Sequence, residues 1–213
     1  MSQQGIAYVL KRGLDVAAAL AVLSVTWPII LVASVAIARQ MGQPILFRQT
    51  RPGRHGALFQ IMKFRTMLEA VDSNGQPLPD ADRLTSLGSF LRRSSIDELP
   101  QLMNVLRGEM SLVGPRPLLV QYLDRYSPSQ SRRHDVLPGI TGWSQVNGRN
   151  AISWPNKLDL DVWYVDNWSL FLDLKILIMT VLYVVRRDGI SAKGHVGMPE
   201  FTGRAALEQG ESP

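Results

Sequence analysis

Asp97 and Glu98 form an adjacent pair of carboxylates in a setting that suits covalent or metal chemistry. They lie between Arg92 and Pro100, in a stretch that continues to a Gly-Pro-Arg-Pro turn at 114–117. Carboxylates placed just before a helix are favoured in their ionised form by the helix dipole and by the free backbone N–H groups. An ionised carboxylate can attack phosphorus or bind a divalent metal. The pair is therefore a candidate for either role.

A purely structural interpretation of the same pair is also open. Residues 95–98 read Ser-Ile-Asp-Glu, which fits the capping box that begins many helices. Pro100 opposes that register, because inside the helix it would remove a backbone donor. A helix that begins near Leu99, with Pro100 in its first turn, leaves both acids just outside it. Spacing alone leaves catalysis and helix capping as alternatives.

Several basic side chains have contexts that suit a phosphate. Lys63 and Arg65 lie in the basic, glycine-punctuated segment 42–67, for which a charged surface hairpin is the alternative. Arg116 is flanked by two prolines, which fix the backbone and present its guanidinium in one direction. Arg149 follows a glycine that permits close backbone approach to an anion, although an exposed turn explains the same residues.

Length and composition limit the class of protein. With 213 residues and 46% hydrophobic content, the chain can form one main domain with a single core. The absence of cysteine excludes a disulfide framework, a thiol nucleophile and a thiolate metal site. The 3 histidines are too widely spaced for a zinc cluster. The net charge of +5 predicts an anionic partner, which can be a phosphate, a nucleic acid or a membrane surface.

Residues 16–38 carry no charge and are about long enough to cross a bilayer as one helix. Pro28 lies within this segment and deprives the Ser24 carbonyl of its helical donor, which favours a bend or break. Both flanks are basic, and the positive-inside rule places both in the cytoplasm. We therefore predict a re-entrant helix-break-helix in preference to a spanning helix, with Ser24 or Thr26 bonding the carbonyls freed at the break.

The remaining patterns predict an α/β fold, mainly α with a small β hairpin, in a compact cytoplasmic domain with interfacial amphipathic helices. In the helix expected at 84–93, Leu84, Leu87, Phe90 and Leu91 share the inward face. The apolar segment 170–185 is interrupted by two charges and is short for a span, so we expect it at the membrane interface or against the core. In chain order we expect strands at 45–48 and 58–64, a polar loop at 72–82, and helices at 84–93, 102–106 and 118–126.

Together these segments closely resemble the bacterial sugar transferase family, the monotopic phosphoglycosyl transferases. The matching stretches cover nearly the whole chain in the family's order, and the ending SAKGHVGMPEFTG is similar to the diacetylbacillosamine-type protein glycosylation branch. The chain resembles the minimal, catalytic-core form, so we expect a re-entrant anchor at 1–40, a catalytic domain at 41–200 and a flexible tail at 201–213. The stretches are KRGLDV, LFRQTRPGRHGALFQIMKFRTM, DRLTSLGSFLRRSSIDELPQLMNVLRGEMSLVGPRP, LPGITGWSQVNGRNAISW and LDVWYVDNWSLFLDLKIL.

The resemblance implies an activity and a mechanism. Such enzymes transfer a sugar-1-phosphate from a UDP-sugar to a polyprenyl phosphate such as undecaprenyl phosphate and release UMP. They carry out the first membrane step of glycoconjugate assembly, in exopolysaccharide synthesis or protein glycosylation, at the cytoplasmic face of the bacterial inner membrane. Asp97 is then the nucleophile that forms an aspartyl-phosphosugar intermediate, and the lipid phosphate attacks that intermediate. The family needs Mg²⁺ near the dyad, and the resemblance implies Asp97 and Glu98 as its ligands. Whether Glu98 acts as a metal ligand, as a base or as both stays open.

The resemblance also assigns substrate-binding roles by position. The family's re-entrant bend shows Ser directly before the proline, whereas Trp27 precedes Pro28 in this chain. The residues that match family positions near the phosphates or the uridine, or acidic positions late in the motif set, are Lys63, Arg92, Arg116, Arg149, Asp161 and Asp173.

Three other functions remain open on the sequence. A membrane-anchored interaction protein would use its basic face on anionic lipids without catalysis. A nucleic-acid binder would not explain the uncharged segment 16–38, and the sequence shows no recognised binding motif, so no nucleic acid is expected. A glycosyltransferase that moves the sugar alone would release UDP. The identity of the sugar, the preferred polyprenol and the formation of a homodimer also stay open.

Overall fold

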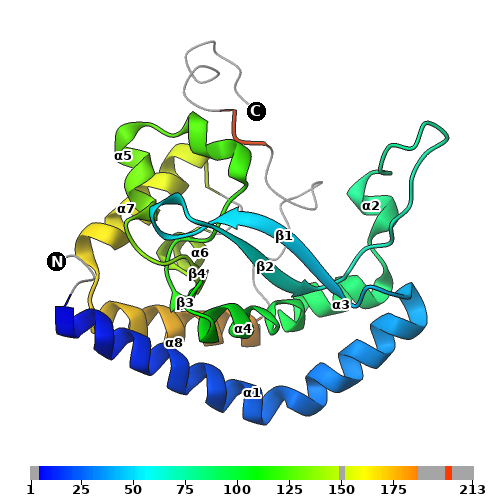
Figure 1. The fold of residues 1–213 in the computed structure, drawn as a ribbon, viewed down its shortest axis with the longest axis horizontal. Coiled ribbons are helices and arrows are strands. Elements are labelled where there is room, and N and C mark those ends of the chain that lie inside the picture. Colours follow the sequence, from blue (N-terminus) through cyan, green and yellow to red (C-terminus); the bar gives the residue numbers. More distant parts are fainter. Residues whose placement is uncertain (1–4, 149–151, 187–199, 203–213) are drawn as a thin grey trace.

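The computed structural model describes residues 5–148, 152–186 and 200–202. Within these residues the chain is mainly helical, with two small two-stranded sheets (Figure 1). The elements in chain order are α1 (Gly5–Met41), β1 (Leu46–Pro52), η1 (Arg54–Gly56), β2 (Leu58–Phe64), α2 (Asp80–Arg83), α3 (Ser86–Arg93), η2 (Ile96–Glu98), α4 (Gln101–Leu106), β3 (Ser111–Val113), η3 (Val120–Arg125), α5 (Pro128–Ser131), η4 (Arg132–His134), β4 (Gly139–Thr141), α6 (Trp143–Asn147), α7 (Trp154–Asn167) and α8 (Leu170–Arg186).

The long first helix, α1, is apolar and long enough to cross a membrane. It runs through Pro28 as one helix of 37 residues and changes direction about half-way along (Figure 1). The predicted pair of short helices is therefore corrected to one bent helix, because a proline removes a single backbone donor and the helical bonds on either side persist. The hydroxyl of Thr26 donates to the carbonyl of Val22 at 2.7 Å, whereas Ser24 is exposed. The re-entrant path itself stays a prediction.

The first half of α1 is attached to the rest of the chain by buried charged side chains. Lys11 donates to the carboxylate of Asp173 on α8 at 2.5 Å and to the carbonyl of Val113 on β3 at 3.2 Å. One turn further along, the carboxylate of Asp15 accepts the backbone N–H of Leu112 at 3.1 Å. The motif KRGLDV therefore fixes the position of α1 against β3 and α8.

The two sheets bring separate parts of the chain together. The antiparallel hairpin of β1 and β2 confirms the strand predicted at 58–64, and β1 starts at Leu46 and extends beyond the predicted 45–48 to Pro52. The parallel pair of β3 and β4 was not predicted, because each strand has only three residues. Gly114, directly after β3, lies so close to β4 that a Cβ there would meet the carbonyl oxygen of Leu137 at 2.3 Å.

The helix predictions are correct in position and wrong in some details. Helix α3 occupies most of the predicted 84–93, with the side chain of Thr85 accepting the N–H of Gly88 as its N-cap. Leu91 is buried as predicted, but Phe90 is 51% exposed, so its predicted inward position is wrong. The predicted helix at 118–126 is the 3₁₀ segment η3, and the predicted loop at 72–82 ends in the short helix α2.

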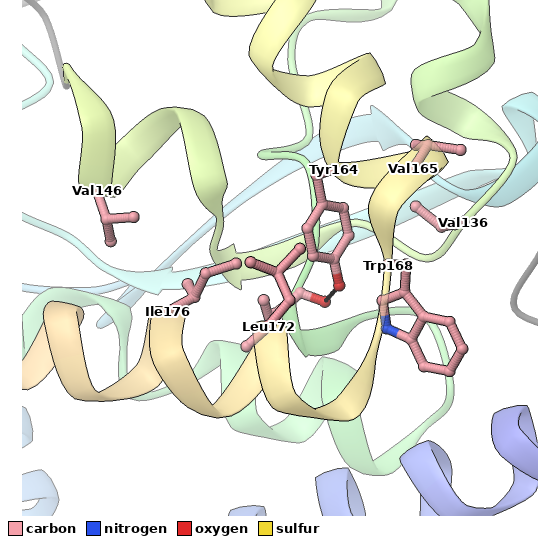
Figure 2. Close-up of a cluster of buried hydrophobic side chains, with 8 residues drawn as sticks. Val136, Val146, Tyr164, Val165, Trp168, Leu172 and Ile176 are labelled. Carbon is pink, nitrogen blue, oxygen red and sulfur yellow. Dashed lines mark hydrogen bonds between the residues drawn. The ribbon is translucent and has the colours of Figure 1, made fainter. Parts of the chain in front are cut away.

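The largest hydrophobic cluster joins α7 and α8 to β3 (Figure 2). Tyr164 lies at its centre, and its hydroxyl lies within hydrogen-bond distance of two acceptors, the carbonyl of Val113 at 3.1 Å and the carboxylate of Asp173 at 2.7 Å. Helix α8 buries Leu172 and Ile176 in this cluster and leaves an opposite apolar face exposed. That face consists of Phe171, Leu174, Ile178, Val181 and Leu182.

Candidate active site

The two acids of the pair lie in a short 3₁₀ turn directly before α4. Ser95 has a left-handed backbone (φ 56°) and its side chain caps nothing, so the capping-box interpretation is wrong. Helix α4 begins at Gln101, two residues after the predicted Leu99, so Pro100 is its N-cap and not part of its first turn. Asp97 and Glu98 are therefore outside the helix, and the local sequence directs two neighbouring carboxylates into one site.

Glu98 is held by two cations from separate parts of the chain. Its Oε1 accepts hydrogen bonds from Lys63 on β2 and from Arg116 after β3, both at 2.6 Å. Burial alone would raise the pKa of Glu98, but the charges and hydrogen bonds of Arg116 and Lys63 outweigh it and hold the pKa well below its usual range. Glu98 is therefore ionised, and one of its two oxygens is occupied by protein donors.

Asp97, the residue directly before Glu98, has the opposite environment. It is only 8% exposed, and within the described residues its carboxylate forms no hydrogen bond. Burial, together with the negative charge of Glu98, raises the pKa of Asp97 to about 6, and the charges of Lys63, Arg116 and Arg92 oppose this shift only in part. Its oxygens are therefore available to an incoming atom.

Arg92 is placed beside the pair by close packing of α3. Gly88 on α3 lies against the backbone of Thr66, where a Cβ would come within 1.9 Å of the Thr66 carbonyl oxygen. This contact lets the Nε of Arg92 donate to the Thr66 hydroxyl at 3.0 Å, and the charge of Arg92 then acts on Asp97. Arg65, the neighbouring cation, is instead bonded to backbone carbonyls after α1, including that of Gly42 at 2.8 Å.

The predicted substrate-binding residue Asp161 is bonded to two buried side chains of the protein. Its carboxylate accepts from Arg133 at 2.7 Å and from the hydroxyl of Ser144 at 2.6 Å, and all three side chains are buried. The same Arg133 donates to the backbone carbonyl of Arg116 at 2.7 Å. The geometry therefore makes Asp161 part of the support for Arg116, while a direct role with substrate stays a prediction.

Asp173, the other late acid, belongs to the attachment of α1. Its carboxylate accepts from Lys11, from the hydroxyl of Tyr164 and from the indole N–H of Trp168, the last at 3.2 Å. Among the described residues both oxygens of Asp173 accept from these partners, and none of the partners belongs to the pair. Arg149 lies outside the described residues, so its predicted role stays untested.

Two residues of the site were missed by sequence reasoning. Arg133 lies in a basic stretch that resembles an exposed connection, and its partner Asp161 is 28 residues away, so no local pattern marks it. Thr66 is an ordinary polar residue whose importance comes only from the approach of α3. Among the described residues, no three His, Cys, Asp or Glu side chains group as a metal cluster.

Comparison with known proteins identifies the family. The family model described as "Bacterial sugar transferase" matches residues 6–187. The chain belongs to the bacterial sugar transferase family. It is therefore a transferase enzyme, and the site built on Asp97 and Glu98 lies inside the matched region.

Relatives extend this similarity. The chain is 56% identical over 195 residues to the uncharacterized sugar transferase EpsL of Bacillus subtilis, covering 92% of this chain and 96% of that protein. It is 44% identical over 188 residues to the UDP-glucose:undecaprenyl-phosphate glucose-1-phosphate transferase of Caulobacter vibrioides, covering 84% and 70%. It is 41% identical over 197 residues to the UDP-galactose-lipid carrier transferase of Erwinia amylovora, covering 84% of this chain but only 41% of that protein. The chain thus spans about two fifths of some relatives.

Proposed function

We propose that this protein transfers a sugar-1-phosphate from a UDP-sugar to a polyprenyl phosphate and releases UMP. The observation that carries the proposal is the contrast within the pair, where Glu98 is fixed by Lys63 and Arg116 while Asp97 is buried and without a hydrogen bond. The similarity to the UDP-glucose:undecaprenyl-phosphate glucose-1-phosphate transferases of Caulobacter vibrioides and Escherichia coli supports the substrate classes.

The reaction then proceeds in two displacements at one phosphorus atom. A carboxylate oxygen of Asp97 attacks the β-phosphorus of the UDP-sugar, the bond from that phosphorus to the bridging oxygen breaks, and UMP leaves with the bonding electrons. A phosphate oxygen of the polyprenyl phosphate next attacks the same phosphorus, and the bond to Asp97 breaks. The products are UMP and a polyprenyl diphosphate sugar, and the carboxylate is restored.

The cations of the site supply what this chemistry needs. Breaking a phosphoanhydride develops negative charge on phosphate oxygens, and fixed cations in a partly buried site stabilise that charge. Lys63 and Arg116 each have further N–H groups beyond those bonded to Glu98. Arg92 adds a third positive charge beside Asp97. We assign these three residues to the diphosphate of the donor.

The donor set fits Mg²⁺, which is usually bound by one or two carboxylates and the phosphates of a substrate. The unbonded carboxylate of Asp97 and the Oε2 of Glu98 are the oxygens that would hold it. When bound, the ion would neutralise diphosphate charge.

We place this chemistry at the cytoplasmic face of the bacterial inner membrane, with α1 as the anchor. Helix α1 is apolar and mostly exposed, and α8 has an exposed apolar face that suits a membrane interface. If α1 re-enters the bilayer at its bend, tags at Met1 and Pro213 will both be cytoplasmic. A periplasmic N-terminal tag would contradict the re-entrant path and leave the chemistry intact.

The decisive experiment measures nucleotide release from a panel of UDP-sugars with undecaprenyl phosphate and Mg²⁺. We expect UMP from one or a few sugars, and no UMP from Asp97→Asn. A sugar-phosphate mass adduct on Asp97 in the absence of the lipid would identify the nucleophile. UDP as the sole nucleotide product, or activity retained in Asp97→Asn, would contradict the proposal.

A further inference from the structure

Arg51, on β1, shares a sheet face with the site residue Lys63. In the register of the hairpin, Lys63 pairs with Phe47 and Arg51 pairs with Phe59. Paired residues lie on the same face of a sheet, and so do alternate residues along a strand. Phe47, Gln49, Arg51 and Lys63 therefore share one face, with the backbone of Arg51 roughly 13 Å along the strand from the level of Lys63, at about 3.3 Å per residue.

The guanidinium of Arg51 is only partly satisfied by the protein. It donates to the neutral amide oxygen of Gln49 at 2.5 Å. Its Nε is buried and has no hydrogen-bond partner within the described residues. A charged donor in this state favours an anionic partner, because a charge-assisted hydrogen bond offsets the cost of its burial.

Arg116 connects Arg51 electrostatically with the dyad. Burial and then the charge of Arg116 lower the pKa of Arg51 to about 10, and the same two causes, in the same order, lower the pKa of Lys157 to about 8. The carboxylate of Glu98 bonds Lys63 and Arg116. Arg51 and Lys157 are therefore both within electrostatic reach of Arg116, and the resulting excess of positive charge favours a second negative group near Arg51.

We propose that Arg51 binds the phosphate that leaves with the nucleotide. This inference rests on the proposed function, which places the β-phosphorus of the donor at Asp97 between Lys63, Arg92 and Arg116. The second phosphate of the same diphosphate then extends along Arg116 toward Arg51. Strand β1 packs against η3, and Figure 1 shows the region from η3 to α5 on the side of the hairpin away from α1. The lipid phosphate is expected from the opposite side, where α1 and the apolar face of α8 lie.

The test compares UMP with uridine as ligands of the purified full-length protein in detergent with Mg²⁺. We expect Arg51→Gln to weaken UMP binding about tenfold or more, the range for a lost hydrogen bond to a charged group, and to leave uridine binding unchanged. The KM for the UDP-sugar rises by a similar factor, whereas the KM for undecaprenyl phosphate stays within about twofold. Arg51→Lys should restore part of the UMP affinity, since it keeps the charge.

Arg48→Gln is the matched control, because Arg48 is exposed and lies on the same strand with the opposite parity. It should leave all four quantities unchanged, namely UMP affinity, uridine affinity and the KM values of the UDP-sugar and the lipid phosphate. The inference is overturned if Arg51→Gln keeps full UMP affinity, weakens UMP and uridine equally, or raises the KM of the lipid phosphate alone. Failure of the proposed function looks different: the wild type would bind UMP and lose that binding in Arg51→Gln, yet release no UMP from any donor.

Discussion

The dyad and the support behind it contain buried carboxylates in opposite states. Asp161 is 1% exposed and its two oxygens accept from Arg133 and Ser144, so its charge is fully compensated by the protein. Asp97 is 8% exposed and accepts no hydrogen bond in the described part of the chain. Burial therefore does not distinguish Asp97 from Asp161. The protein donors do, since Asp161 accepts from Arg133 and Ser144 and Asp97 accepts from none in the described residues.

The difference has an energetic meaning. A buried carboxylate without donors is destabilising, because its desolvation is not offset by hydrogen bonds. The protein keeps Asp97 in this state while neighbouring Glu98 bonds Lys63 and Arg116, which is the state that the proposed function requires of a nucleophile. Asp161 shows that the same fold can supply hydrogen-bond donors to both oxygens of a buried acid.

The largest expected effect on activity comes from Asp97→Asn. We expect at least a 10³-fold loss of UMP release, because an amide is not a nucleophile here and removal of a nucleophile typically costs this much or more. The thermal midpoint of Asp97→Asn should equal or exceed that of the wild type, since a poorly compensated charge is removed. A fall in the midpoint would show that Asp97 is structural.

Asp161→Asn should produce the reverse pattern. The amide leaves the buried guanidinium of Arg133 without its counter-ion, and breaking a buried pair in this way costs about 3 kcal/mol. Chemical denaturation in detergent would measure the loss of stability, and a residual activity that tracks the folded fraction would confirm the supporting role. Asp159→Asn, on an exposed position of the same helix, is the control and should change neither quantity.

Glu98→Gln tests how the role of the second carboxylate of the dyad differs from that of Asp97. We expect roughly a 10²-fold loss of activity, comparable with removal of a fixed electrostatic group from an active site. Burial and the charge of Arg116 already lower the pKa of Lys63, and Glu98 is the largest opposing influence. The basic limb of the pH–rate profile should therefore move to lower pH in Glu98→Gln. An unchanged basic limb would show that Lys63 does not titrate in the pH range of activity. Glu69→Gln, which changes an exposed acid, is the control and should have the pH–rate profile of the wild type.

The sequence predicted the dyad and its position before α4 well, because Pro100 determines the helix start locally. It also predicted Lys63, Arg92 and Arg116 as site residues, and the structure brings all three to the pair. Sequence patterns are sufficient to predict the structure where a proline, a glycine or a strand pattern determines the conformation of residues close to it in the chain.

Sequence reasoning did less well where partners are distant. Asp161 and Asp173 were predicted as substrate-binding from their position in a motif, and this role stays a prediction. Their bonds to Arg133 and Lys11, 28 and 162 residues away, were not predicted. Phe90 was predicted inward from helical spacing, but α3 has only eight residues and a narrow buried face. The helical periodicity shows which residues share a face, and only tertiary contacts show which of them are covered.

The smallest expected effect is the pH dependence of the stability difference between wild type and Asp97→Asn. The pKa of Asp97 is raised to about 6 in the folded protein, so the proton it binds stabilises the fold below about pH 4, and this stabilisation is lost as pH rises through about 6. Glu98 does not contribute to the change between pH 5 and 7, because its lowered pKa keeps it ionised in the folded state and an unfolded Glu is mostly ionised there as well.

The wild type alone would not show this effect clearly. Burial lowers the pKa of His134 to about 4, so an unfolded chain with an ordinary histidine gains protons below about pH 6.5 and the fold loses stability in the same window. His134 is present in both proteins, so its contribution cancels in the difference between them. We therefore expect wild type to lie furthest below Asp97→Asn at pH 7, and the gap to narrow by about 1 kcal/mol by pH 5 and to close only near pH 4. A gap that stays constant from pH 5 to 7 would mean that Asp97 is compensated in the folded protein as fully as Asp161.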